Sequence, residues 1–126
     1  MSFVLKKSSS SYKWPVDFSQ PSDGGVRESQ SFDAEFKRLP QSRINEIKVL
    51  AQRRAKAEEA GEESEDTISD ISLADEILVG WDGITDGDKP VPFTKATKRQ
   101  LLEIPMLAAA LVESYFESLI EEKRKN

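Results

Sequence analysis

The hydrophobic pattern of this 126-residue chain changes its period once, close to Pro40. Before that point apolar and polar residues alternate, which is typical of strands with one buried face. After it apolar residues recur every three or four positions, which is typical of α-helices. The length suggests a single domain, residues 1–126, and the change of period divides it into a β-rich part, residues 1–39, and a helical part, residues 40–126. The predicted fold class is α+β.

Two alternating segments flank a strong turn signal in the β-rich part. Residues 12–18 and residues 26–37 follow a two-residue period, and Pro-Ser-Asp-Gly-Gly at residues 21–25 separates them. We expect a small N-terminal antiparallel β-hairpin, or a three-stranded sheet in which the apolar residues 3–5 add a strand. Pro15 has no amide hydrogen, so the first strand is expected at a sheet edge. The apolar face of the second strand is predicted to end with Phe32, Ala34 and Phe36.

The helical part is predicted to contain a bundle of three to four α-helices. The first begins at Pro40 or Ser42, because proline is tolerated in the first turn and serine caps free amide groups. Residues 55–66 carry charges but no large apolar side chain, so they form either an exposed extension of that helix or a mobile loop. A second helix is predicted over residues 66–79, with a cap at Ser72. Its apolar stripe comprises Ile68, Ile71, Ala74, Ile77, Leu78 and Trp81.

Two further helices are predicted after a turn-rich connector, residues 80–92. Thr94 is a favourable cap for the first of them, and Pro105 marks the start of the second. The second has an apolar surface wider than the stripe of ~100° that suffices for a surface helix. It is therefore either a central core helix or a helix shared between the core and another polypeptide. The residues of this surface are Leu107, Ala108, Leu111, Val112, Tyr115, Phe116, Leu119 and Ile120.

Composition argues against several classes of function. The 23 acidic and 18 basic residues give a formal charge of −5, which does not suit a nucleic-acid binder. Cysteine and histidine are absent, so thiolate chemistry and the commonest metal ligand are missing. No apolar run is long enough for a membrane span, and the first residues lack the apolar core of a signal peptide. We expect a cytosolic protein that is not an enzyme and that binds no cofactor, nucleic acid or membrane.

Two acidic segments invite a functional interpretation that their residues do not support. An EF-hand loop beginning at Asp82 would place Ile84 and Phe93 at ligand positions, and neither has a side-chain oxygen. The carboxylates of residues 58–66 lie in a segment without large apolar residues, which supplies no cleft for acid–base chemistry. We therefore predict no metal site and no catalytic residue, and we interpret these segments as tight turns and a solvated surface.

The order and spacing of several short motifs resemble the tail assembly chaperones of long-tailed, siphovirus-type bacteriophages and their prophages. The resemblance covers roughly residues 32–119, which is most of the chain. The motifs are Phe32–Pro40 before a helix, then Trp81–Ile84, Pro90–Thr94 and Leu101–Pro105, and finally an Ala/Leu-rich helix ending in Tyr115–Phe116.

The resemblance implies a function in protein binding. Such chaperones act in the cytoplasm of the host cell, where they bind the tape measure protein, keep its apolar surface soluble and recruit tail tube subunits. They are absent from the mature virion, and many have a longer form produced by ribosomal frameshifting, of which this chain would be the shorter counterpart. The family is also associated with spiral self-assembly. The expected partners are therefore the tape measure protein, the tail tube protein and further copies of this chain as a homo-oligomer. The alternative function is a minor structural tail or head–tail joining protein of the virion.

We expect partner contacts to come from the apolar surface near the end of the chain. A long helical partner requires an exposed apolar groove or helix on the protein that coats it. The acidic charge would keep unbound copies soluble. The candidate partner-binding residues, which follow from the pattern alone, are Trp81, Leu107, Leu111, Tyr115 and Phe116. Among them, Trp81 is expected to organise the connector.

Overall fold

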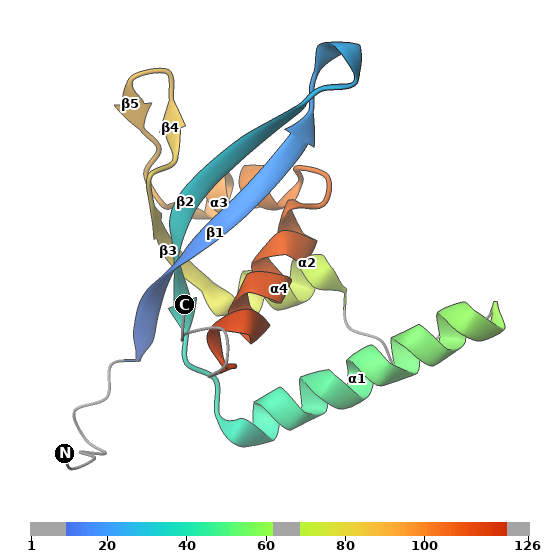
Figure 1. Ribbon diagram of the computed structural model, residues 1–126. Coiled ribbons are helices and arrows are strands. Elements are labelled where there is room, and N and C mark those ends of the chain that lie inside the picture. The colour runs from blue at the N-terminus through green and yellow to red at the C-terminus, as the bar shows by residue number, and fades with distance from the viewer. Residues whose placement is uncertain (1–9, 62–68, 121–126) are drawn as a thin grey trace.

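The computed structural model describes residues 10–61 and 69–120 (Figure 1). The elements are β1 (Ser11–Pro21), a 3₁₀ turn (Asp23–Gly25), β2 (Arg27–Lys37), α1 (Gln41–Ala60), α2 (Asp70–Ile77), β3 (Leu78–Asp82), β4 (Thr85–Asp86), β5 (Lys89–Pro90), α3 (Lys95–Leu102) and α4 (Leu107–Ser118). Within these ranges, an antiparallel sheet in the order β1-β2-β3 is combined with four α-helices. The predicted α+β class is confirmed.

The hairpin of β1 and β2 forms most of the sheet. The two strands pair without a bulge over their full length of eleven residues each. The turn between them places Gly24 and Gly25 at φ values of 74° and 77°, a left-handed conformation that glycine adopts without steric penalty. β1 lies at the edge of the sheet, as Pro15 predicts. The predicted apolar face is also confirmed, because Ala34 and Phe36 are buried.

The third strand of the sheet comes from the helical part of the chain. β3 pairs with β2 in a region where the hydrophobic pattern predicts a helix over residues 66–79. That prediction is wrong beyond Ile77, because the following residues pair with the second edge of β2 and so bond main-chain groups that would otherwise lie open. Residues 3–5, the alternative third strand, and Ile68 lie outside the described residues.

The structure also corrects the cap and the apolar stripe of α2. Ser69, and not Ser72, caps the helix, because the Ser69 hydroxyl accepts a hydrogen bond from the amide of Ser72 at 3.1 Å. Ile71 is 50% exposed and therefore lies outside the buried stripe. Leu78 and Trp81 are buried as predicted, but they belong to β3 and not to a helix.

α1 buries side chains only near its beginning. Ile44 and Ile47 are its buried residues, and beyond them the helix projects from the body of the molecule (Figure 1). The helix ends at Ala60, and Gly61 follows in the left-handed conformation typical of a helix cap. Of the two alternatives for residues 55–66, the exposed helical extension is therefore confirmed as far as Ala60, and residues 62–68 lie outside the described part.

α3 and α4 begin close to the predicted positions. The side chains of Thr94 and Thr97 each bond to the other's main chain at the start of α3, which is a capping box. α4 begins at Leu107, shortly after Pro105. Among the described helices, none is both long and apolar enough to cross a membrane.

α4 is the central element of the core. It packs against β1 and α2. Near its end the ring of Tyr115 stands edge-on to Phe36, with 5.2 Å between the ring centroids. The Tyr115 hydroxyl donates a hydrogen bond to the carbonyl of Lys37 at 2.9 Å and accepts one from the amide of Leu39 at 3.2 Å. The buried core comprises Val16, Ala34, Phe36, Ile44, Ile47, Leu73, Ala74, Ile77, Leu78, Trp81, Leu102, Leu107, Ala108, Leu111 and Tyr115.

Candidate partner-binding groove

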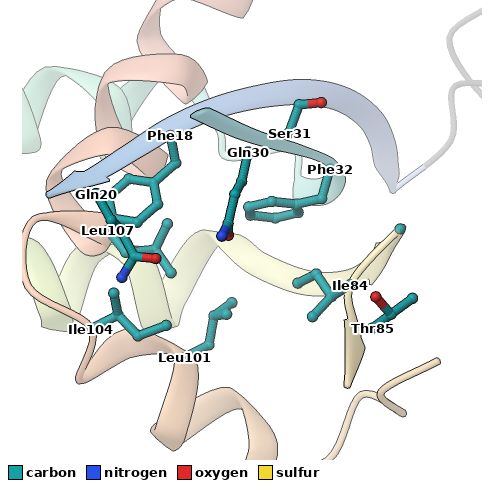
Figure 2. A pocket seen from close by; sticks show the side chains of 11 residues that line it. Phe18, Gln20, Gln30, Ser31, Phe32, Ile84, Thr85, Leu101, Ile104 and Leu107 are labelled. Carbon is teal, nitrogen blue, oxygen red and sulfur yellow. The ribbon is translucent and has the colours of Figure 1, made fainter. Parts of the chain in front are cut away.

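The far half of the β-hairpin extends past the helices (Figure 1). It forms the ceiling of a groove, which we call the hairpin groove (Figure 2). Its volume is about 390 Å³, within the range of ~300–1,000 Å³ that is usual for ligand clefts. The lining residues are Phe18, Gln20, Gln30, Ser31 and Phe32 from the hairpin, Gly83, Ile84 and Thr85 from the β3–β4 connection, and Leu101, Ile104 and Leu107 from the α3–α4 corner.

The floor and the ceiling of the hairpin groove differ in chemistry. The floor at the α3–α4 corner is apolar, whereas the ceiling adds the amide groups of Gln20 and Gln30 to two phenylalanine rings (Figure 2). Among the residues that the structure describes, no charged side chain lines the groove, although 33% of the residues of the chain are charged. The groove can therefore contact a partner through its shape, its apolar side chains and hydrogen bonds from uncharged groups.

The α3–α4 corner depends on an unusual backbone conformation at Met106. Its φ is 70°, and this left-handed region costs a residue with a side chain about 1–2 kcal/mol. The conformation allows the chain to turn between Ile104 and Leu107, whose main chains are joined by a hydrogen bond of 3.2 Å, while both side chains line the groove. The Met106 side chain is 74% exposed, so burial does not offset the strain. Strain of this kind is often retained at functional sites.

A family model for the YdaY prophage protein matches residues 34–121, which is most of the chain. The chain belongs to the YdaY prophage protein family. No curated protein and no solved structure matches it. The expectation of a phage or prophage protein is confirmed at this level.

In this YdaY-family protein, the range matched by the family model includes the floor of the hairpin groove but not its ceiling. The whole floor, from Gly83 to Leu107, lies within the matched range, whereas the ceiling residues from Phe18 to Phe32 precede it. The groove thus combines a floor that fits the family pattern with a ceiling outside that pattern.

Most of the predicted partner-binding residues of this YdaY-family protein lie inside the molecule. Leu107, Leu111 and Tyr115 are 1%, 0% and 1% exposed. Leu107 borders the floor of the hairpin groove, whereas Leu111 and Tyr115 hold α4 in the core. Phe116 is half-buried on α4 and packs against the core. The structure therefore gives Leu111 and Tyr115 a packing function, and partner binding by any of these residues stays a prediction.

Trp81 attaches the connector to the sheet of this YdaY-family protein. Its indole Nε1 donates a hydrogen bond to the carbonyl of Val91 at 2.9 Å, and its ring stands edge-on to Phe93 with 4.8 Å between the centroids. These contacts match the organising role expected of Trp81 in the connector. A contact between Trp81 and a partner stays a prediction.

Sequence reasoning did not identify the ceiling of the hairpin groove. Phe18 lies opposite Gln30 in the hairpin, and Gln20 follows Phe18 on the same face of β1. A signal was present, because the inward face changes from aromatic residues to glutamine toward the turn, which a fully buried face would not do. The opposing floor, however, is supplied by residues about fifty to ninety positions later, and their proximity appears only in the fold.

The groups with shifted pKa values lie away from the hairpin groove. Arg43 donates hydrogen bonds of 2.9 and 2.7 Å to the two carboxylate oxygens of Glu76, which lowers the pKa of Glu76. A hydrogen bond from Lys13 to Asp82 raises the pKa of Lys13, and burial raises the pKa of Tyr115. In the ranges that the structure describes, no three acidic, histidine or cysteine side chains gather in a way that could hold a metal ion.

Proposed function

We propose that this protein is a tail assembly chaperone of a prophage and that the hairpin groove holds an apolar helical segment of the tape measure protein. The observation that carries the proposal is an open, uncharged groove with an apolar floor on a small acidic member of a prophage family. Such a groove suits recognition of a helix that presents apolar side chains at intervals of three and four residues. The described residues that line the groove include no ionisable side chain, which supports a binding function in preference to catalysis.

Binding in the groove would keep the apolar ridge of a tape measure protein away from other exposed chains before the tail tube forms. One groove covers only a short stretch, so a long partner requires many copies side by side. The proposal therefore includes self-association of the chain, recruitment of tail tube subunits that displace it, action in the host cytoplasm, and absence from the mature virion.

Co-expression with the tape measure protein of the same prophage tests this proposal. We expect the tape measure protein to be soluble in the presence of the chain and to aggregate in its absence. Ile104→Asp places a carboxylate on the groove floor and is expected to abolish the effect, because a bound partner would have to desolvate an unpaired charge. The matched control, Ile71→Asp, makes the same change at an exposed position of α2 outside the groove. Equal insolubility with and without the unaltered chain would contradict the function, and an equal loss in both variants would contradict the groove.

Two further measurements separate the chaperone from the alternative virion protein. Mass spectrometry of purified virions is expected to detect none of the chain, and a stoichiometric amount would favour a minor tail or head–tail joining protein. Size-exclusion chromatography with light scattering tests self-association. A chain that stays monomeric both alone and with the tape measure protein would contradict the side-by-side arrangement.

A further inference from the structure

The ceiling of the hairpin groove indicates which partner segments can bind there. Gln20 and Gln30 project from the hairpin toward the floor (Figure 2). Each side-chain amide can both donate and accept hydrogen bonds. Neither amide bonds to another side chain or to the main chain within residues 10–61 and 69–120. Two amides that have no bonding partner among the described residues therefore face an apolar surface formed by Leu101, Ile104 and Leu107.

A groove with amide groups above an apolar floor suits a partner segment that has an apolar side and a polar side. An apolar ridge would fill the floor, and uncharged polar groups beside the ridge would bond to the glutamines. A charged group in the same place would lose its water without an opposite charge in the lining to compensate, which is costly. The groove therefore disfavours charged partners as well as favouring apolar ones.

The projecting helix α1 supplies no such segment for a second copy. The projecting half of α1 carries mainly alanines and charged residues, and Val49 is its exposed large apolar side chain. A neighbouring copy that docked through α1 would bring charges beneath Gln20 and Gln30. The chemistry of the groove thus fits a foreign helix better than this projecting arm.

We propose that Gln20 and Gln30 determine the specificity of the hairpin groove by selecting helices whose apolar ridge is flanked by uncharged polar residues such as glutamine, serine or threonine. The inference rests on the proposed function for the identity of the partner. It adds that only the uncharged stretches of a long helical partner dock. Both glutamines precede the range matched by the family model, so this specificity belongs to a part of the chain that the family pattern does not define.

Three synthetic amphipathic peptides of about 20 residues, longer than the ~12–15 residues below which isolated helices are marginal, test the inference. The peptides share one leucine ridge and differ only in its flanking residues, which are glutamine and serine in the first, lysine in the second and glutamate in the third. Isothermal titration calorimetry with the full chain is expected to show about tenfold tighter binding of the uncharged peptide than of either charged one, equivalent to ~1.4 kcal/mol.

Charge variants of the ceiling are expected to change this order. The double variant Gln20→Glu, Gln30→Glu should prefer the lysine peptide by about tenfold, because two carboxylates then face the flank of the ridge. Gln52→Glu makes the same chemical change on the exposed surface of α1 and should leave the order unchanged. Both ceiling glutamines lie outside the core, and thermal melting followed by circular dichroism checks that the variants remain folded.

Equal affinities for the three peptides, no binding of any of them, or an unchanged order in the double variant would overturn the inference. Co-expression with the tape measure protein separates this failure from that of the proposed function. A soluble tape measure protein with equal peptide affinities would remove the role of the glutamines and leave the function. A clear peptide preference with an insoluble tape measure protein would remove the function and leave the specificity of the groove.

Discussion

The two halves of the β-hairpin share one uninterrupted ladder but differ in what covers them. α4 covers the near half, where Tyr12 and Phe36 contact Tyr115. The far half extends beyond the helices (Figure 1) and carries Gln20 and Gln30 over the hairpin groove (Figure 2). The same alternation of inward-facing residues thus builds the core at one end and an open surface at the other. A small chain can obtain an open groove when its strands are longer than the helix that covers them.

The largest difference in the free energy of unfolding is expected when one leucine beneath each half of the hairpin is truncated to alanine. Leu111→Ala creates a cavity beneath the near half and should lower the free energy of unfolding by about 3 kcal/mol, because Leu111 is fully buried. Leu101→Ala at the groove floor removes a half-buried side chain and should cost only about 1 kcal/mol. Urea denaturation measures both values. Equal losses would show that the groove floor is packed as tightly as the core.

A smaller effect is expected from the hydrogen bonds that fasten α4 to the near half. Tyr115→Phe leaves the Leu39 amide without its partner and should lower the free energy of unfolding by about 1–2 kcal/mol. Tyr12→Phe removes only the hydrogen bond between the hydroxyls of Tyr12 and Ser118 and should cost less than about 1 kcal/mol. Thermal unfolding compares the two variants, and the reverse order would refute this account of how α4 is held.

Low pH is expected to lower the free energy of unfolding and to leave peptide binding in the hairpin groove unchanged. Arg43 lowers the pKa of Glu76 in the fold, so their pair stabilises the protein above the pKa of an unfolded glutamate, about 4.3. This contribution is lost as the pH falls through the lower folded value. Glu76→Gln should cost about 0.5–1 kcal/mol at neutral pH, and its difference from the unaltered chain should vanish in stronger acid.

Urea denaturation over a pH series measures that convergence. Binding of the uncharged peptide in the hairpin groove should not vary between about pH 5 and pH 8, because no titratable group lines it within residues 10–61 and 69–120. A constant cost of Glu76→Gln at every pH would contradict the assignment of the acid effect to this pair.

The smallest change in stability, and one of opposite sign, is expected at the α3–α4 corner. Met106→Gly relieves the left-handed strain and should raise the free energy of unfolding by about 0.5 kcal/mol, because the flexibility of glycine offsets part of the gain. Met106→Ala keeps the strain and serves as the control. A loss of stability in the glycine variant would show that the exposed methionine side chain supports the fold.

The sequence predicted the elements whose signals are local. Thr94 caps a helix through residues beside it, and Pro15 marks an edge strand because it lacks an amide hydrogen. β3 could not be predicted in this way. Leu78 and Trp81 recur at a spacing that also fits a helix, and only the open edge of β2, distant in sequence, makes the segment a strand.

The hairpin groove could not be predicted for a related reason. The apolar residues of its floor, such as Leu101 and Ile104, have the spacing of ordinary core residues. Whether they are sealed or left open depends on how far β1 and β2 extend beyond α4 and on the turn at Met106. Both are properties of the assembled layers and not of any one segment.

Alternate residues of the hairpin face opposite sides of the sheet, so the register of β2 decides which side chains form the ceiling. Ala34 and Phe36 are buried, so they fix β2 at its inner end. One residue inserted between Asp33 and Ala34 would shift the residues between the turn and Asp33 by one position along the strand. The side chains of Phe32 and Gln30 would then point to the solvent. Asp33 would then face the hydrophobic floor. A single insertion, with every original side chain retained, would therefore replace the amides on which the proposed partner preference depends.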